Sequence, residues 1–322
     1  MDNPMKRLLG ILTNPDKRFL ALANRGFYNR MDDEPYLRKM FKARVGYELN
    51  LDHPRSFNEK LQWLKLYDRN PLYTVMVDKI EAKKYVEGII GGQYIIPTIA
   101  VWENVESIRL DSLPNRFVLK CSHDSGGLVI CKDKKTFDLD TAKAKLTWFM
   151  QRKYFLHGRE WPYKNVVPRI LCEAFLGDMA EEDQEGGREN KDFMDYKIMC
   201  FGGKTKCSFV CSERYSTDGL KVTFFDRDWQ VMPFIRYYPK STRAIPKPQT
   251  YEKMIELSEK LAKDLPFARI DWYEIGGNPY FGEITLFPGN GFEPFTPVSA
   301  DYELGSWIPL PDGKAADNKQ LR

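Results

Sequence analysis

The chain has 322 residues, enough for one large domain or two modest ones with buried cores. Hydrophobic residues make up 43% and charged residues 29%, a balance typical of globular proteins and not of disordered or fibrous ones. The net charge of +4 is too small and too evenly spread to indicate a nucleic-acid partner. No run of eighteen apolar residues is present, so the sequence predicts no transmembrane helix.

The cysteines and the N-terminus indicate the compartment. The six cysteines form no CxxC pair, which favours reduced thiols in a cytoplasmic protein over a disulfide framework. Only three histidines are present, and none stands at zinc-ligand spacing from the cysteines. The N-terminal apolar patch is short and lacks a small-residue cleavage site. We therefore expect a cytoplasmic protein, with contact of its basic N-terminal helices with the inner membrane as an open alternative to packing on the core.

Residues 1 to about 77 are predicted to form a helical region. Ser56 and Glu59 have the capping-box spacing that starts a helix, and apolar residues at helical spacing follow them. Asn70-Pro71 ends that run. A second helix is predicted over residues 73–86.

From residue 94 onward the pattern becomes rich in strands, with further helices over residues 141–154 and 251–265. The predicted strands cover residues 94–101, 117–120, 128–131, 166–176, 193–201, 204–212, 220–229, 268–275 and 279–287. Residues 178–192 are charged and interrupted by glycines, which predicts a mobile surface loop that is either a lid or a plain insertion. Helices alternating with mainly antiparallel strands indicate an α+β fold.

Lys120 and the loop after it form the first candidate site. Lys120 ends a predicted strand, and Ser122, Ser125, Gly126 and Gly127 follow it. Glycines let backbone N–H groups approach an anion closely, and a lysine adds a point charge, so the pattern suits phosphate. It is not a P-loop, because the lysine precedes the loop. Taken alone, the pattern favours an ordinary glycine hairpin with a solvated lysine.

Asp271 and Glu283 form the second candidate site. They lie on adjacent predicted strands joined by a tight turn, so we expect them to face one another across the ladder. Two carboxylates flanked by apolar residues are costly to bury unless a cation lies between them. Hard oxygen ligands of this kind suit a Mg²⁺ ion that carries a polyphosphate. Salt bridging to Arg269 is an equally weighted alternative.

Other residues give weaker signals. Glu173 ends an apolar strand and could take the amine or ribose edge of a nucleotide, although a lone acid on a strand is usually an exposed face residue. Asp226 and Asp228 form a DxD motif, which holds a metal in some glycosyltransferases, but their position favours a hairpin turn. His123 could be a general base, although a loop histidine bonded to the backbone is commoner.

The order of these pieces is more specific than any one of them. In chain order they are Asp78-Lys79, Lys120 with its glycine loop, Glu173, Asp195-Tyr-Lys197, Arg269-Ile-Asp271 and Glu283-Ile-Thr-Leu-Phe-Pro-Gly289. This succession resembles the ATP-grasp enzymes over roughly residues 45–310, and specifically the TupA-like (teichuronopeptide biosynthesis) branch found with bacterial surface-polysaccharide genes. The motifs that resemble this branch are Phe57-Asn-Glu-Lys60, Phe117-Val-Leu-Lys-Cys121, His123 with Ser125-Gly126, and Gly282-Glu-Ile-Thr285.

The resemblance implies a role for each motif residue. Lys79 and Lys120 would contact the ATP phosphates, and Arg269 would stabilise the tetrahedral intermediate. Mg²⁺ would be bound by Asp271, Glu283 and Thr285; the threonine stands where many relatives have asparagine, which puts a second metal ion in doubt. The remaining expected nucleotide contacts are a loop that closes over the phosphates (Ser122, His123, Ser125, Gly126, Gly127), an adenine site (Glu173, Ala174, Leu176) and a ribose-binding acid (Asp195).

The resemblance also implies an architecture and an activity. We expect a helical region (1–77) and an ATP-grasp domain (78–322), with a glycine-loop lobe over about 115–200 and a metal-binding lobe over about 201–310. The implied activity is ATP-dependent ligation of an amine to a carboxylate through an acylphosphate. The implied acceptor is a uronic-acid-containing surface glycan, with polysaccharide assembly proteins as further partners. The alternatives are a glycan kinase, a glycosyltransferase that uses Asp226 and Asp228, and a non-catalytic nucleotide-binding or scaffolding protein.

Overall fold

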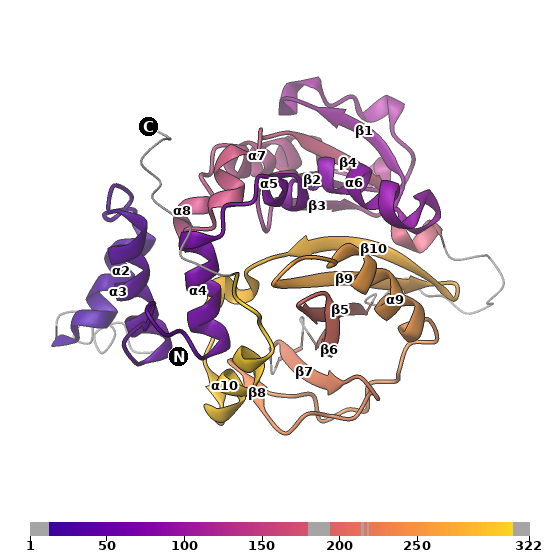
Figure 1. Ribbon diagram of the computed structural model, residues 1–322. Coiled ribbons are helices and arrows are strands. Elements are labelled where there is room, and N and C mark those ends of the chain that lie inside the picture. Colours follow the sequence, from indigo (N-terminus) through magenta and orange to yellow (C-terminus); the bar gives the residue numbers. More distant parts are fainter. Residues whose placement is uncertain (1–12, 180–193, 214–215, 218, 312–322) are drawn as a thin grey trace.

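The computed structural model describes residues 13–179, 194–213, 216–217 and 219–311. Two antiparallel sheets lie one above the other in Figure 1, and an N-terminal group of helices lies beside them. The predicted loop 178–192 falls almost entirely outside the described residues, as does the N-terminal apolar patch. Within the described ranges, no helix is both long and apolar enough to cross a lipid bilayer.

The N-terminal region is helical, as predicted. Its helices are α2 (Pro15–Asn24), α3 (Asp33–Val45), α4 (Phe57–Tyr67), α5 (Leu72–Val77) and α6 (Glu81–Ile90). The capping box at the start of α4 is confirmed, because Ser56 accepts a hydrogen bond from the Glu59 backbone and the Glu59 carboxylate accepts one from the Ser56 backbone.

The single helix predicted over residues 73–86 is wrong, because the chain breaks at Asp78. The Asp78 carboxylate accepts hydrogen bonds from the backbone N–H groups of Ile80 (2.9 Å) and Glu81 (3.4 Å) and so starts α6 afresh. The Lys79 N–H donates instead to the Ser122 carbonyl oxygen, 3.1 Å away in the glycine loop. The break therefore ties this linker to the predicted phosphate loop.

The first sheet has the strand order β1-β4-β2-β3. Its strands are β1 (Thr98–Trp102), β2 (Phe117–Cys121), β3 (Leu128–Cys131) and β4 (Ile170–Ala174). Helix α7 (Leu139–Met150) packs on one face, where Phe117, Leu119 and Leu146 are fully buried. Residues Val118, Lys120 and Glu173 share the opposite face, because residues two apart on a strand point the same way.

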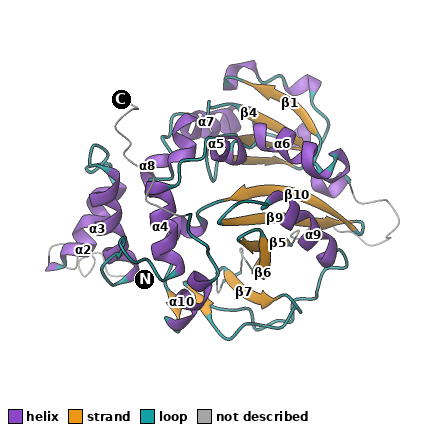
Figure 2. Cartoon of the chain, viewed as in Figure 1, coloured by secondary structure: helices purple, strands orange, loops and turns teal. Residues whose placement is uncertain are grey.

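The second sheet has the order β10-β9-β5-β6-β7. Its strands are β5 (Asp195–Phe201), β6 (Lys204–Ser212), β7 (Lys221–Asp226), β9 (Phe267–Ile275) and β10 (Asn278–Thr285). The predicted meander and final hairpin are present, and α9 (Tyr251–Leu261) covers the sheet beside β5 and β6 (Figure 2). A short pair, β8 (Ile235–Arg236) with β11 (Phe295–Thr296), forms a separate two-stranded sheet.

The sheets divide the chain at different residues from those expected. The first lobe already includes β1, at residues 98–102, because β1 pairs with β4. Strand β5 belongs to the second sheet, because it pairs with both β6 and β9. The first sheet thus spans residues 98–174 and the second begins at Asp195, in place of the expected boundaries at about 115 and 201.

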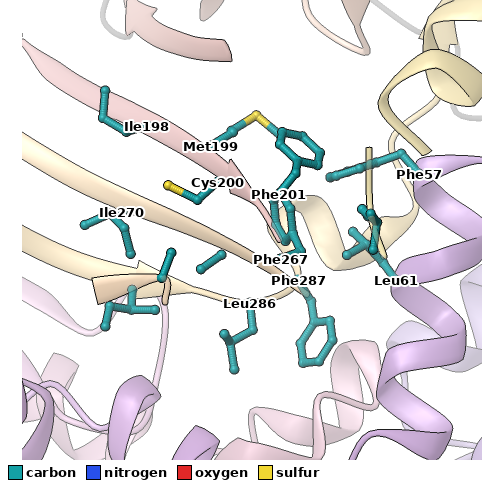
Figure 3. Packing of buried hydrophobic residues seen from close by; sticks show 14 of the residues in the cluster. Phe57, Leu61, Ile198, Met199, Cys200, Phe201, Phe267, Ile270, Leu286 and Phe287 are labelled. Atoms are coloured by element: carbon teal, nitrogen blue, oxygen red, sulfur yellow. The ribbon is translucent and has the colours of Figure 1, made fainter. Parts of the chain in front are cut away.

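The N-terminal helices share a core with the second sheet. Phe57 and Leu61 of α4 lie against Phe201 of β5 and Phe267 of β9, and all four side chains are at most 3% exposed (Figure 3). The Phe57 and Phe267 rings meet edge to face at 5.1 Å. The helical region is therefore packed as part of the second lobe.

Gly305 permits close packing of α10 (Ser299–Ser306) on the start of α4. A Cβ atom on Gly305 would lie 2.2 Å from the Arg55 carbonyl oxygen, which is backbone and cannot move aside easily. We expect Gly305→Ala to lower the free energy of unfolding by about 1–3 kcal/mol through overpacking. Gly88→Ala is the matched control, because Gly88 lies in α6 with open space around its Cβ position. Urea unfolding should show this control to be neutral or more stable by up to about 1 kcal/mol.

Candidate functional site

Asp271 and Glu283 lie opposite one another, as predicted. They are register partners on β9 and β10, next to an irregularity between Phe281 and Glu283. Gly282 lies at this irregularity, where a Cβ atom would stand 3.1 Å from the Asp271 carbonyl oxygen. The hairpin therefore places both carboxylates together at one point of the sheet.

Two cations hold these carboxylates. Arg269 donates two hydrogen bonds to Asp271 (2.6 and 2.7 Å) and one to Glu283 (3.2 Å). Lys197 of β5 bonds both Asp271 and Asp195, the latter at 2.6 Å. Burial opposes the charge of Arg269, but its acidic neighbours outweigh burial and raise the pKa of the guanidinium. The salt bridge to Arg269, which the sequence left open as an alternative to a bound cation, is thus present.

Glu283 is the more accessible of the two acids. Its side chain is 41% exposed, whereas that of Asp271 is 4% exposed. Burial opposes its ionisation, but Lys79 and Arg269 outweigh burial and lower the pKa of Glu283 to about 2. Thr285 follows on the same strand, with its hydroxyl 3.4 Å from the Glu283 carboxylate. Glu283 is therefore ionised at neutral pH and reachable by a ligand.

Lys79 connects the glycine loop to the carboxylates. Its ammonium donates to the Asp124 carbonyl oxygen at 2.9 Å and lies 3.8 Å from a Glu283 carboxylate oxygen. The break between α5 and α6 brings it there, because a continuous helix would not free the Lys79 backbone to bond Ser122. Lys79 and Glu283 also line one small pocket together with Tyr163. Residues more than 200 positions apart thus meet at this point.

Lys120 is held by Glu173. The Glu173 carboxylate forms ion pairs with both Lys120 and Lys83, and the latter also donates to the Ile96 carbonyl oxygen at 2.7 Å. Glu173 is only 3% exposed, so the alternative prediction of an exposed acid on the strand surface is wrong. Burial opposes its ionisation, but the two lysines outweigh burial and lower its pKa to about 2. Glu173 therefore positions Lys120 on the face of the first sheet.

The predicted phosphate loop divides into buried and open residues. Ser122 is fully buried and donates to the Val167 carbonyl oxygen at 3.2 Å. His123 is 3% exposed, and burial lowers its pKa, so a contact with a ligand would require the loop to move. Gly127 packs so tightly that a Cβ atom would lie 2.9 Å from Cys121. Ser125 and Gly126 are exposed and form the part of this loop that a ligand can reach.

The other expected contacts lie at the edge of the site. Asp195 begins β5 and bonds Lys197. The Ala174 backbone N–H already donates to the Pro97 carbonyl oxygen at 3.0 Å, and Leu176 is half-buried in the turn after β4. Ala174 and Leu176 thus belong to the end of the first sheet, and Asp195 belongs to the second sheet.

Asp226 and Asp228, the residues of the DxD motif, belong to a hairpin turn. Asp226 ends β7, and its carboxylate accepts hydrogen bonds from the backbone N–H groups of Asp228 (3.0 Å) and Gln230 (2.8 Å). This geometry matches the predicted hairpin turn. Neither residue is an ion-pair partner of the Arg269 cluster.

Sequence reasoning missed Lys83, Lys197 and Glu160. Lys197 belongs to the Asp195-Tyr-Lys197 motif, which by itself assigns it no role, and Lys83 has the pattern of an ordinary helix residue in a charged run. Glu160 is 4% exposed, and burial raises its pKa to about 7 against the opposing charges of Lys65 and Arg269. A lysine two residues after Asp195, on a strand that is otherwise apolar, is the one signal that could have identified Lys197.

The comparison with protein families decides the family. A family model described as TupA-like ATPgrasp matches residues 59–309, which is most of the chain. The chain belongs to the TupA-like ATP-grasp family. A comparison with curated proteins gives no match.

Solved structures that match the TupA-like chain include two D-alanine–D-alanine ligases and the ATP-grasp ligase PsnB. D-alanine–D-alanine ligase from Helicobacter pylori is 16% identical, with a TM-score of 0.42 over 78% of this chain and 69% of that one. The ATP complex of the Bacillus anthracis ligase is 14% identical, with a TM-score of 0.37 over 66% and 55% of the two chains. The ligase PsnB with minimal precursor, Mg and ADP is 8% identical, with a TM-score of 0.36 over 72% and 60%. The chain thus spans little more than half the length of some of these ligases, and the family membership rests on the matched family model.

The residues of this TupA-like protein fit a Mg²⁺ ion that carries a triphosphate. Glu283 offers an exposed, ionised carboxylate, and Mg²⁺ in such sites takes one or two protein carboxylates with phosphate oxygens completing its shell. Lys79 and Lys120 supply positive charge beside it. Among the described residues no group of three or more His, Cys, Asp or Glu side chains could hold a metal by itself, so the phosphates would have to supply ligands.

Proposed function

We propose that this protein is an ATP-dependent carboxylate–amine ligase that works through an acylphosphate. The observation that carries the proposal is the convergence on Glu283 of Lys79, from the α5–α6 break, and Arg269, from β9. Lys120 adds charge from the other lobe and lowers the pKa of Glu283 further. Cations from both lobes around an ionised acid suit the binding of Mg-ATP between the lobes.

The face of the first sheet suits the purine. Leu128 and Ile130 of β3 are the register partners of Lys120 and Val118, so they share the face from which Lys120 projects. Leu128 and Ile130 are 39% and 46% exposed, so together they present an apolar surface beside Lys120. An adenine ring on Leu128 and Ile130 would cover them and leave the phosphates beside Lys120.

The proposed reaction has two steps. A carboxylate oxygen of the acceptor attacks the γ-phosphorus of ATP, and ADP leaves, which gives an acylphosphate. An amine then attacks the acyl carbon, loses a proton, and displaces inorganic phosphate. Bound Mg²⁺ would neutralise charge on the phosphates. Lys79 and Lys120 would orient the phosphates, and Arg269 would stabilise the negative oxygen of the tetrahedral intermediate.

We infer that the acceptor is a uronic-acid-type group of a bacterial surface polysaccharide or its precursor, joined to an amino acid or another amine. Membership of the TupA-like family supports this substrate class. Such chemistry belongs in the cytoplasm, at the inner face of the membrane where the precursor is assembled. The DxD-based glycosyltransferase alternative has no support, because Asp226 is occupied by its turn.

Coupled measurement of ADP and phosphate tests the function. We expect both products only when a uronic acid and an amine are present together. Phosphorylated acceptor without an amine requirement would select the glycan kinase instead. Formation of AMP would contradict the acylphosphate route.

Lys79→Met should weaken ATP binding about tenfold to a hundredfold, because a charge-assisted contact with phosphate is lost. Lys84→Met is the matched control: Lys84 lies on α6 with its side chain 71% exposed and pairs only with Glu81 among the described residues. Calorimetric titration with a non-hydrolysable ATP analogue measures both variants. Equal affinities for the two variants would contradict the assignment of Lys79.

A further inference from the structure

A second pocket lies away from the proposed nucleotide site. Its volume is about 210 Å³, the volume of about seven water molecules and enough for one pyranose ring. Residues of α2, α3 and α8 (Phe155–Gly158) line it together with the segments that follow β8 and β10. Its lining includes Asn24, Arg44, His157, Tyr237, Tyr238 and Asn290, together with the acid Glu293.

Two short segments extend from this pocket toward the proposed catalytic centre, and a buried lysine joins them. Asn290 lies in the short helix (Pro288–Gly291) that follows β10, the strand of Glu283. The fully buried Lys65 ammonium donates to the carbonyl oxygens of both Asn290 (2.7 Å) and Gly158 (2.8 Å). Glu160, two residues after Gly158, interacts electrostatically with Arg269. Segment 283–290 thus runs from Glu283 in the proposed catalytic centre to Asn290 in the pocket. Segment 157–160 runs from His157 in the pocket to Glu160, the residue that interacts with Arg269.

The pocket carries an uncompensated positive charge. Its acid, Glu293, lies 2.9 Å from the guanidinium of Arg236 and is neutralised by it. Arg44, on the exposed side of α3, forms no ion pair with any residue that the structure describes. Burial, together with Arg152 and Arg44, lowers the pKa of His157, so its ring is neutral at pH 7 and can donate or accept hydrogen bonds.

Two tyrosines complete the pocket. The rings of Tyr237 and Tyr238 stand edge to face at 4.9 Å, and neither hydroxyl has a hydrogen-bond partner in the described part of the chain. Tyr237 (φ +59°) and Asn290 (φ +56°) are both in the left-handed region, a costly conformation that persists where the surroundings impose it and that clusters at binding sites. The Tyr237 N–H donates to the Pro294 carbonyl oxygen at 3.0 Å and holds this conformation.

We propose that this pocket binds an acidic sugar unit next to the one that reacts, so that the acceptor is an oligosaccharide with at least two uronic acids. Aromatic faces with unpaired hydroxyls, amides and one free arginine match a pyranose ring that carries hydroxyls and a carboxylate. The reacting carboxylate lies beside Arg269, and a second carboxylate pairs with Arg44. This inference rests on the proposed ligase function and adds the length and charge of its acceptor.

Binding of the full chain to galacturonate and to digalacturonate, measured by calorimetry without nucleotide, tests the pocket. We expect the dimer to bind about tenfold more tightly or better than the monomer. Arg44→Gln should remove this advantage. Lys39→Gln, which removes an exposed charge from the same helix but lies outside the pocket, should keep it.

Steady-state assays separate this inference from the ligase itself. The same preference should appear as a lower KM for the dimer, with the KM for ATP unchanged in Arg44→Gln. Equal binding of monomer and dimer, no binding of the dimer, or an unaffected Arg44→Gln variant would overturn the pocket assignment. Absence of ADP with every acid and amine, with the dimer preference intact in calorimetry, would instead reject the ligase function alone.

Discussion

Replacing Glu283 with glutamine is expected to lower the rate of ADP formation by about 10²–10³, the loss typical of removing one group that stabilises charge in a transition state. Glutamine keeps the shape of Glu283 and removes its charge. Arg269 and Lys79 would then face a neutral amide, and the carboxylate proposed to bind Mg²⁺ would be absent. Steady-state release of ADP under saturating ATP and acceptor measures the effect.

Fold stability distinguishes this effect from damage to the protein. Because the Glu283 variant loses its ion pairs with Lys79 and Arg269, urea unfolding first establishes the conditions under which it stays folded, and its activity is compared with that of the wild type there. Glu256→Gln is the matched control: this exposed glutamate of α9 pairs with Lys253 and Lys260 on its own helix. Full activity of the Glu283 variant would show that this acid does not serve the reaction.

Glu173→Gln is expected to lower the free energy of unfolding by about 3–5 kcal/mol, the cost of breaking a buried ion pair from one side. The carboxylate is 3% exposed, and Lys83 and Lys120 both bond it. The variant would leave two lysine charges facing a neutral amide. Urea unfolding at pH 7 measures the loss, with Glu87→Gln, an exposed residue of α6, as the control.

The pH dependence gives a second measurement on Glu173. Its pKa in the folded state, about 2, is below the ordinary value of 4.5, so the folded state favours the ionised form. This contribution is therefore complete above pH 4.5 and is lost as the pH falls towards 2. Wild-type stability should drop across this window by more than that of Glu173→Gln. An equal loss of unfolding free energy in the two proteins between pH 4.5 and pH 2 would contradict the role of Glu173 in holding the lysines.

The sequence could predict the parts of the site that are local along the chain. Asp271 and Glu283 belong to one hairpin, so a tight turn and the alternation of side chains suffice to place them opposite one another. The capping box of Ser56 and Glu59 is equally local. The α+β fold followed from the order of the elements, and the family from the order of the motifs.

The parts that sequence reasoning missed depend on tertiary contacts. Helical periodicity continues through Asp78 and Lys79, and the break there goes with a tertiary hydrogen bond from the Lys79 backbone to Ser122, beside the local cap that Asp78 gives to α6. The ion pair of Glu173 with Lys83 requires the position of α6 against β4, which spacing alone does not give. The pocket of Arg44 and Tyr237 likewise depends on how the N-terminal helices pack on the second lobe.

Calorimetric titration of the full chain with a non-hydrolysable ATP analogue, with and without Mg²⁺, tests the central claim most directly. The arrangement of Lys79, Lys120 and Glu283 predicts one bound nucleotide per chain, held at least about tenfold more tightly when Mg²⁺ is present. Absence of binding, or an affinity that Mg²⁺ does not change, would contradict the assignment of this site to Mg-ATP.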